Sequence, residues 1–331
     1  MTSRISLFSN FLVKAVYFSI AAAFIGTALC QSAHAQISFG GATQLVDNDA
    51  NQGSPTIIWY KSEPVMYYVN HSNNTIYVDF GLSGNPISTG ISVYSAELTD
   101  VGAAVLGSQV LISYFEPNQS VAFALSSNGS SFGAPVTPAP SSLGLNGTPN
   151  SSFVPALLAD DGSVYVATVG DTNGVYIAST VDGVNYTPIG QGSVSTCATI
   201  SRPSLTIYQG VWVGYTSSCA GSRYAVVGPA TSHTLGIATG AVSWGNSNRN
   251  GNYAGINLIV YNSALYVFGQ DTASSQQLKY MYCSSDCATW SAASDTGNQM
   301  RWTPSLILSP SNIVYLVYQD DGNTNISYRL N

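Results

Sequence analysis

A repeat of about fifty residues constrains this 331-residue chain more than any other feature. Each copy opens on a proline or a small residue, continues as an apolar stretch, and passes through a turn into a second stretch rich in Tyr and Val. The copies follow at intervals of 48, 52, 48, 52 and 49 residues and begin at Pro55, Ala103, Pro155, Pro203, Gly255 and Pro304. Such a period is typical of architectures built from one repeated supersecondary unit. The chain is therefore expected to arrange six similar units side by side.

The pattern inside each copy predicts strands rather than helices. Short alternating runs of β-branched and aromatic residues are separated by Gly, Asn, Asp and Ser, which is typical of strands and turns. Only 8% of the residues are charged, and the chain has 31 Gly and 21 Tyr. A coiled coil or long helical bundle would need far more Lys, Glu, Arg and Ala. The fold class is therefore expected to be all-β.

Fifty residues with about four strands match one blade of a β-propeller. The last copy ends on its third strand, residues 325–330, whereas residues 36–46 form a spare strand at the front. Pairing the two would close a ring and remove the exposed sheet edges. We therefore predict a β-propeller of six four-stranded blades closed by the N-terminal strand. The alternatives are another blade number, a two-sheet sandwich and a β-helix, but the last two do not explain a missing final strand matched by a spare first one.

The first 35 residues are typical of a secretory signal peptide. Arg4 and Lys14 mark a positive region, residues 15–29 form an apolar run, and Ala33 and Ala35 supply the small residues of a cleavage site. The run is shorter than the ~20 residues that span a bilayer. We expect a secreted, periplasmic or extracellular protein whose single propeller domain covers residues 36–331 and does not associate with a membrane after cleavage. An uncleaved membrane anchor and a lipid anchor at Cys30 are the alternatives.

Charge and cysteine content exclude several classes of partner. Nine Lys and Arg against sixteen Asp and Glu give a net charge of −7, which excludes the basic stripe needed to bind nucleic acid. The four cysteines after residue 35 suggest two disulfides in an exported chain. No cluster of ligands has the spacing of a zinc site. We therefore expect a monomer without metal or cofactor.

Three copies carry a similar turn between their third and fourth strands, at residues 126–132, 179–186 and 284–290. These turns resemble the Asp-box, a Ser-x-Asp-x-Gly-x-x-Trp hairpin repeated in sialidase-like propellers. Its Ser and Asp side chains bond the backbone of the turn, its Gly takes positive φ, and its aromatic residue packs on the blade. The copies that begin at Pro55 and Pro203 lack the motif, and the first also lacks the Arg-Ile-Pro phrase of sialidases.

The resemblance implies which face of the ring is functional, because Asp-boxes lie opposite the active site. The turns after the second strands and the inter-blade loops would then share the upper face. Candidate catalytic carboxylates there are Glu116, Asp171, Asp271 and Asp320. Candidate ligand-binding residues there are Arg202, Arg249, Arg301, Trp302, Trp244 and His71. The same orientation would pair Cys197 with Cys219 on the upper face and Cys283 with Cys287 in the third Asp-box turn.

These residue types favour carbohydrate recognition. Arginine forks and carboxylates bind hydroxyl groups or a ligand carboxylate, and aromatic faces stack on sugar rings. We therefore expect a lectin-like propeller that binds a carbohydrate or glycoconjugate at the upper mouth of the ring. A sialidase-like glycoside hydrolase is the first alternative, since two facing carboxylates suffice for that chemistry. A surface adhesin with a protein partner is the second.

Overall fold

The computed structural model describes residues 37–46, 53–94, 100–192, 198–219, 222–230, 236–238, 255–271, 276–284, 287–320 and 325–331. Residues 38–331 form one unit, and residues 1–37 are assigned to another. The predicted signal peptide lies outside the described residues, so it and the domain boundary at residue 36 stay predictions. In the part of the chain described here, no helix is long and apolar enough to cross a membrane.

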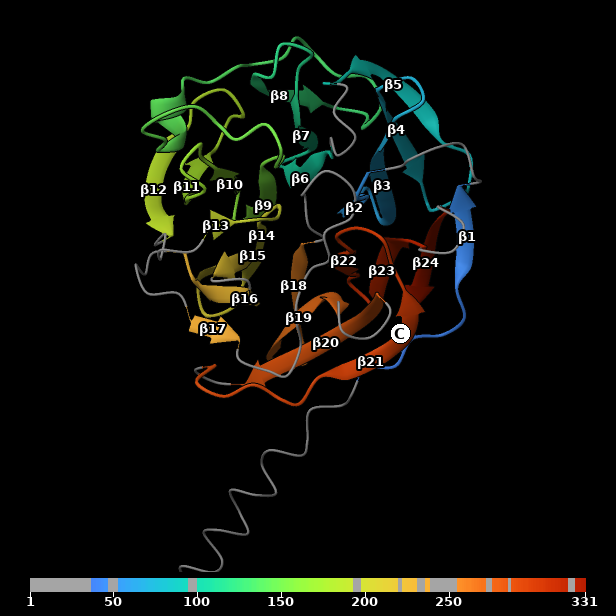
Figure 1. Ribbon diagram of the computed structural model, residues 1–331. Helices are drawn as coiled ribbons and strands as arrows, with labels where there is room; N and C mark the ends of the chain where they lie inside the picture. Colours follow the sequence, from blue (N-terminus) through green and yellow to red (C-terminus); the bar gives the residue numbers. More distant parts are fainter. Residues whose placement is uncertain are drawn as a thin grey trace, which may run out of the picture. The chain divides into compact units, whose positions relative to one another are not determined.

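The structure is a six-bladed β-propeller, as the repeat predicts (Figure 1). Each blade is an antiparallel sheet whose strands come from one stretch of the chain, except the sixth, which also contains the N-terminal strand. The first blade contains β2 (Thr56–Tyr60), β3 (Glu63–Asn70), β4 (Thr75–Phe80) and β5 (Ile87–Ser92). The second contains β6 (Gly102–Leu106), β7 (Gln109–Phe115) and β8 (Val121–Ser126). The third contains β9 (Ala156–Asp160), β10 (Ser163–Val169), β11 (Val175–Thr180) and β12 (Thr187–Gly192).

The other three blades complete the ring. The fourth contains β13 (Ala198–Thr199), β14 (Ser204–Ile207), β15 (Val211–Cys219), β16 (Ser222–Pro229) and β17 (Gly236–Ala238). The fifth contains β18 (Ile256–Tyr261), β19 (Ala264–Asp271), β20 (Gln277–Ser284) and β21 (Ser294–Gln299). The sixth contains β22 (Ser305–Leu308), β23 (Val314–Gln319) and β24 (Ile326–Leu330), with β1 (Thr43–Val46) paired to β24 as its outer strand. The predicted closure by the N-terminal strand is confirmed.

The second blade fills its fourth strand position differently from the others. A single bridge pairs Phe123 with Val136 there, and the chain then forms the 3₁₀ helix η1 (Pro140–Leu143). Leu143 and Leu145 are buried in the core between the second and third blades. The long loop thus covers the edge of β8, which would otherwise expose unpaired backbone groups.

The hydrophobic core is divided among the interfaces between neighbouring blades. One cluster joins the first blade to the second through Ile58, Tyr67 and Ile112, and another joins the sixth to the first through Met66 and Val317. Second strands are buried on both faces, which is why β3 is buried from Pro64 to Val69 instead of alternating.

Tyrosine suits these interfaces because its ring fills the space while its hydroxyl bonds the next blade. Tyr67 Oη donates to the carbonyl of Gly129 at 2.7 Å. Tyr60 Oη donates to the carbonyl of Ser127 at 2.7 Å. Burial raises the pKa of Tyr215 to about 12, so a buried tyrosine of this kind stays neutral.

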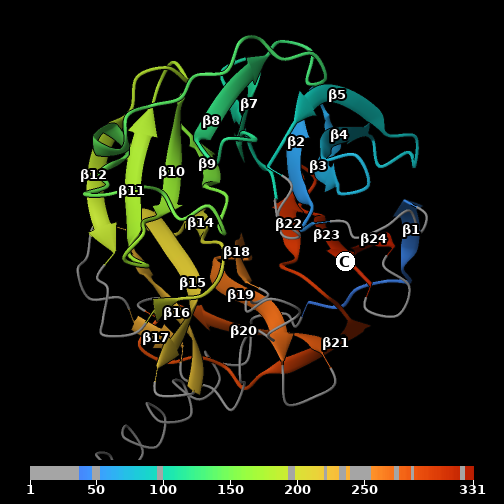
Figure 2. The same ribbon diagram turned by 45° about the horizontal axis from the view of Figure 1, so that its top comes forward.

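The first strands of the six blades surround the axis of the ring (Figures 1 and 2). Their inner edges have no further strand to pair with, and side chains of neighbouring blades bond these edges instead. Ile57 N donates to Ser305 Oγ at 3.1 Å, and Leu258 N donates to Ser204 Oγ at 3.0 Å. Ser113 Oγ donates to the carbonyl of Pro155 at 2.7 Å. The small polar residues that open each repeat therefore join one blade to the next.

Two of the turns that resemble Asp-boxes form the predicted hydrogen bonds. Ser126 Oγ accepts from Gly129 N at 2.8 Å, and Asn128 Oδ1 accepts from Ser131 N at 2.9 Å. In the third blade Thr180 Oγ1 accepts from Gly183 N at 2.9 Å, and Asp182 Oδ1 accepts from Asn185 N at 2.8 Å. Gly129 and Gly183 have φ of 84° and 72°.

These turns also differ from the predicted pattern. Thr180, rather than Ser179, provides the hydroxyl of the third-blade turn, and each glycine directly follows the Asx residue. The Ser285–Asp286 part of the third turn lies outside the described residues, but the Cys283–Cys287 disulfide expected there is present. In the first blade, where no motif was found, the buried Asp79 bonds the equivalent turn by accepting from Ser83 N and Gly84 N.

The turn of the second blade is expected to depend on one hydroxyl. Ser126 is buried, and Ser126→Ala removes an acceptor of Gly129 N and a donor to the Ser131 carbonyl. We expect the free energy of unfolding to fall by about 1–3 kcal/mol, because buried backbone groups lose their partners. Urea unfolding measures the effect. Ser127→Ala is the control, since Ser127 is exposed; equal losses for both variants would contradict this role of Ser126.

Candidate functional site

A cavity of ≈250 Å³ lies on the axis of the ring, and the first strands of all six blades line it. We call it the central cavity. Its lining is apolar or small and polar, with Thr56, Ser204 and Ser305 near the upper ends of the strands and Trp59 and Leu158 further down. Among the described residues that line it, Arg202 is the one charged side chain. The described lining of the cavity is therefore mostly apolar, and Arg202 is its one positive charge.

Arg202 reaches across the ring from the loop that leads into the fourth blade. Its Nη1 donates to Thr56 Oγ1 of the first blade at 3.1 Å, and Thr56 Oγ1 donates in turn to the carbonyl of Val101 at 2.6 Å. Within the described part of the chain, Thr56 is the one group that accepts a hydrogen bond from this guanidinium. A guanidinium has five N–H donors, so most of its donors have no acceptor among the described residues.

Asp100 lies beside this arginine at the start of the second blade. Its Oδ1 accepts from Ser54 N at 2.6 Å. Burial raises the pKa of Asp100 to about 6, although the charge of Arg202 and the bond from Ser54 oppose that rise. Burial also lowers the pKa of Arg202, and Asp100 opposes that change. Both residues are described, and they attract each other without a direct ion-pair contact.

The four predicted carboxylates do not line the central cavity; they divide into two groups on the upper face. Glu116 and Asp171 lie in turns of the second and third blades, which the intervening loop joins. Ser151 Oγ donates to Gln119 Oε1 at 3.3 Å, and Asp171 N donates to the carbonyl of Thr148 at 3.0 Å. Asp171 is exposed and Glu116 is half-buried.

Asp271 and Asp320 lie at the junction of the fifth and sixth blades. Gln270 Nε2 donates to the carbonyl of Met300, and a bridge pairs Met300 with Asp320. The half-buried Arg301 directly follows Met300, and its N donates to the carbonyl of Gln319. The backbone of Arg301 therefore lies close to that of Asp320.

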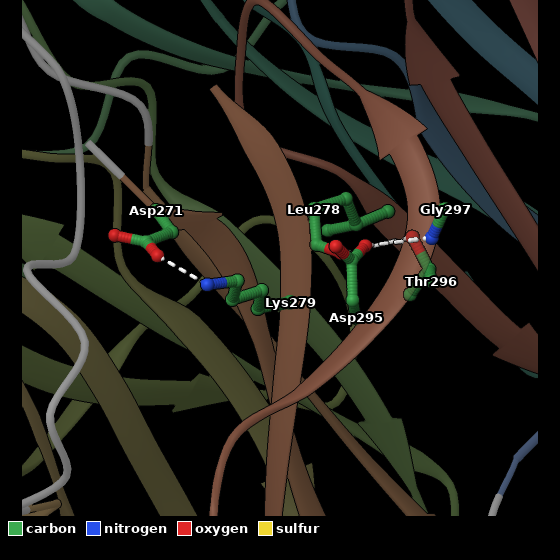
Figure 3. A network of polar contacts seen from close by, with 6 residues as sticks. All are labelled: Asp271, Leu278, Lys279, Asp295, Thr296 and Gly297. Atoms are coloured by element: carbon green, nitrogen blue, oxygen red, sulfur yellow. Dashed lines mark hydrogen bonds and ion pairs between the residues drawn. The ribbon is translucent and has the colours of Figure 1, made fainter. Parts of the chain in front are cut away.

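Figure 3 shows that Asp271 at the end of β19 points toward Lys279 on β20. Asp271 Oδ2 and Lys279 Nζ form an ion pair at 2.6 Å, and the carboxylate side chain is only 3% exposed. On the next strand Asp295 accepts from Gly297 N at 2.7 Å, and Thr296 Oγ1 donates to the carbonyl of Leu278 at 2.8 Å (Figure 3). Asp271 is therefore already neutralised inside its blade, which makes it a poor candidate for contact with a ligand.

His71 lies in the turn after β3, as predicted, and is half-buried. Burial lowers its pKa to about 4, and its buried Nε2 has no hydrogen-bond partner among the described residues. The imidazole is therefore neutral at physiological pH. Trp302 is half-buried in the loop before β22.

The remaining predicted residues cannot be placed. Arg249, Trp244 and Cys197 lie outside the described residues, and so does Asp321. Cys219 ends β15, but its side chain is not described, so the Cys197–Cys219 pairing stays a prediction. Among the residues that are described, no three His, Cys, Asp or Glu side chains gather as metal ligands.

Sequence reasoning placed Arg202 on the upper face but did not single out Asp100 or Thr56. Asp100 is one of several acidic residues in inter-blade loops, and nothing in its local sequence sets it apart. Only the tertiary structure sets Asp100 apart, because it places the carboxylate against Ser54 N and near the arginine of another blade.

Fold and site together define a six-bladed propeller in which the half-buried Arg202 is the one cation among the described residues that line its axis. No family model matches the sequence, and no curated protein matches it. The structure is similar to solved propellers at low identity. A protein of unknown function from Dyadobacter fermentans has a TM-score of 0.64 at 12% identity, over 87% of this chain and 97% of that one.

Two other similar structures have described activities. The sialidase of Trypanosoma rangeli in complex with the inhibitor DANA has a TM-score of 0.57 at 13% identity, over 88% of this chain and 59% of that one. A lectin of Aleuria aurantia in complex with α-methyl-L-fucoside has a TM-score of 0.54 at 10% identity, over 84% of this chain and 91% of that one. At these identities the similarities show the propeller fold alone.

Proposed function

We propose that the protein is a carbohydrate-binding propeller and that its ligand binds at the upper mouth of the ring. The observation that carries the proposal is the Arg202–Asp100 pair, which blades one, two and four hold at the ring axis. A guanidinium fork beside a carboxylate offers donors and an acceptor at one place, as neighbouring sugar hydroxyls require. The half-buried Arg301 and Trp302 are the candidates for further contacts on this face.

A glycan array followed by titration calorimetry tests this proposal. Arg202→Lys keeps the positive charge but loses the planar fork, and we expect affinity for the selected glycan to fall at least tenfold. Arg301→Ala is expected to weaken binding as well. Lys61→Ala is the control, because Lys61 is an exposed cation in the lower-face turn after β2. If Arg202→Lys and Arg301→Ala lower the melting temperature and leave glycan affinity intact, the arginines are structural and the proposal fails.

A glycoside hydrolase is the second candidate, and Asp100 favours it. A carboxyl group whose pKa is near 6 is suited to donate a proton at neutral pH. The hydrolase requires a second carboxylate on the opposite side of the scissile bond. Of the four predicted candidates, Glu116, Asp171 and Asp320 remain, because Asp271 is paired with Lys279. The protein would be a glycoside hydrolase rather than a lectin if it hydrolysed aryl glycosides, lost that activity in Asp100→Asn, and bound nothing on the glycan array.

A further inference from the structure

The first-strand residues that line the central cavity are more buried toward its upper end than toward its lower end. In four of the six blades the part of the first strand that lines the cavity begins buried and becomes half-buried or exposed. In β2 and β6 the first three residues are buried and the fourth is half-buried, and the same change occurs within β22. In β9 only Ala156 is buried, and Ala159 is exposed. The accessible part of the lining thus lies toward the lower face, opposite the predicted carbohydrate site.

The chemistry of the lining changes along the same direction. Near the lower end the accessible side chains are apolar, namely Trp59, Val105, Leu157, Leu158 and Ile307. At the upper end lie hydroxyl groups and Arg202, which is the one titratable side chain among the described lining residues. A ligand that entered from the lower face would first contact the apolar side chains and then Arg202.

Among the described residues, the cation at the upper end has no direct counter-ion. Arg202 donates to one hydroxyl, and its nearest acid, Asp100, makes no ion-pair contact with it. Partial burial of a charge without a direct partner is costly, and an anion that binds its remaining N–H groups would relieve that cost. The site is too small for a drug-sized ligand, since such pockets hold roughly 300–1,000 Å³, but it suits a short hydrocarbon chain.

We propose that the central cavity is a second ligand site, which lies below the proposed carbohydrate site and shares Arg202 with it, for a small amphipathic carboxylate that enters from the lower face. The carboxylate binds Arg202 at the upper end, and the hydrocarbon part packs on the apolar residues below it. Asp100 and the bound carboxylate repel each other, so binding favours the protonated form of Asp100. Affinity therefore falls as pH rises above about 6, by up to tenfold per pH unit.

Titration calorimetry with octanoate, octanol and acetate at pH 5.5 and pH 8 tests the contributions of the carboxylate and of the hydrocarbon chain separately. Octanoate is expected to bind at pH 5.5, with octanol at least tenfold weaker and acetate undetectable. Asp100→Asn is expected to restore octanoate binding at pH 8 to its level at pH 5.5, because it removes the competing carboxylate. Equal affinity for octanol and octanoate, or no octanoate binding at either pH, would overturn the proposal.

A matched pair of variants locates the site. Leu158→Asp places a carboxylate in the half-buried lower part of the cavity, and we expect it to abolish octanoate binding. Val181→Asp makes the same change on a side chain that is 74% exposed in the lower-face turn of the same blade, and it should have no effect. If Leu158→Asp does not fold, Leu158→Ala should weaken octanoate severalfold. Unchanged octanoate affinity in a folded Leu158 variant would exclude the cavity. Glycan binding should survive both Leu158 changes, which separates this site from the carbohydrate site.

Discussion

Replacing Gly102 by alanine is expected to destabilise the propeller by about 3 kcal/mol, a large effect for a single methyl group. A Cβ atom at this position would lie 2.2 Å from Ser113 Oγ and 2.4 Å from the carbonyl oxygen of Pro155. Those two atoms are the partners of a hydrogen bond between the second and third blades. Either the bond breaks or the first strands move apart, and both outcomes loosen the ring at its axis.

Urea unfolding of four variants, namely Gly102→Ala, Gly133→Ala, Ser113→Ala and the Gly102→Ala/Ser113→Ala double variant, measures this effect. Gly133→Ala is the control, because its Cβ would meet nothing closer than Leu125 O at 3.8 Å, and we expect it to change stability by less than 1 kcal/mol. On a Ser113→Ala background the cost of Gly102→Ala should shrink, since one of the two clashing atoms is gone. An unfolding midpoint of Gly102→Ala equal to that of the wild type would refute the close approach.

The second large effect is expected in the pH dependence of stability. The pKa of Asp100 is about 6 in the folded protein against 3.8 ordinarily. The folded state therefore holds the proton more tightly than the unfolded state does. The contribution of Asp100 to the free energy of unfolding is fully present below about pH 4 and is lost as pH rises through 6. The difference between the two pKa values corresponds to roughly 3 kcal/mol.

Asp100→Asn isolates this contribution, because asparagine resembles the protonated acid and its Oδ1 can still accept from Ser54 N. We expect the variant to match the wild type near pH 4 and to be more stable by roughly 2–3 kcal/mol at pH 7. Asp182 does not interfere, since hydrogen bonds from Asn185 and Val184 lower its pKa and its effect falls at more acidic pH. Parallel stability curves for the two proteins between pH 4 and pH 7 would show that Asp100 has an ordinary pKa.

Similar folds leave function open here, as they do for propellers in general. The similar structures include a sialidase and a lectin, and at 13% and 10% identity they carry no residue roles to this chain. In the described part of this propeller the axis carries little charge. Arg202 and Asp100 come from different blades and lie near each other there, while Asp271 is already paired with Lys279.

The fold could be predicted from the sequence because its determinants are local and repeated six times. Turn residues and alternating strands recur at a fixed interval, and a spare strand before Pro55 matches a missing one after Leu330. The side-chain bonds of the 126–132 turn followed from the same local pattern. The second blade could not be predicted in this way. A loop that buries Leu143 takes the place of its fourth strand, and nothing in the repeated sequence pattern indicates this difference.

The candidate site was predictable only in part. The sequence by itself determined the ring, its closure and the presence of Arg202 in an inter-blade loop. Only the tertiary structure decided that Arg202 crosses the axis to Thr56 and that Asp100 approaches it. It also decided that the other candidate carboxylates stay away from the cavity. The physical reason is that strand pairing within a blade joins neighbours in the chain, with β1 and β24 as the exception, whereas the electrostatics of the axis depend on side chains from blades some 50 to 150 residues apart, which the closed ring brings together.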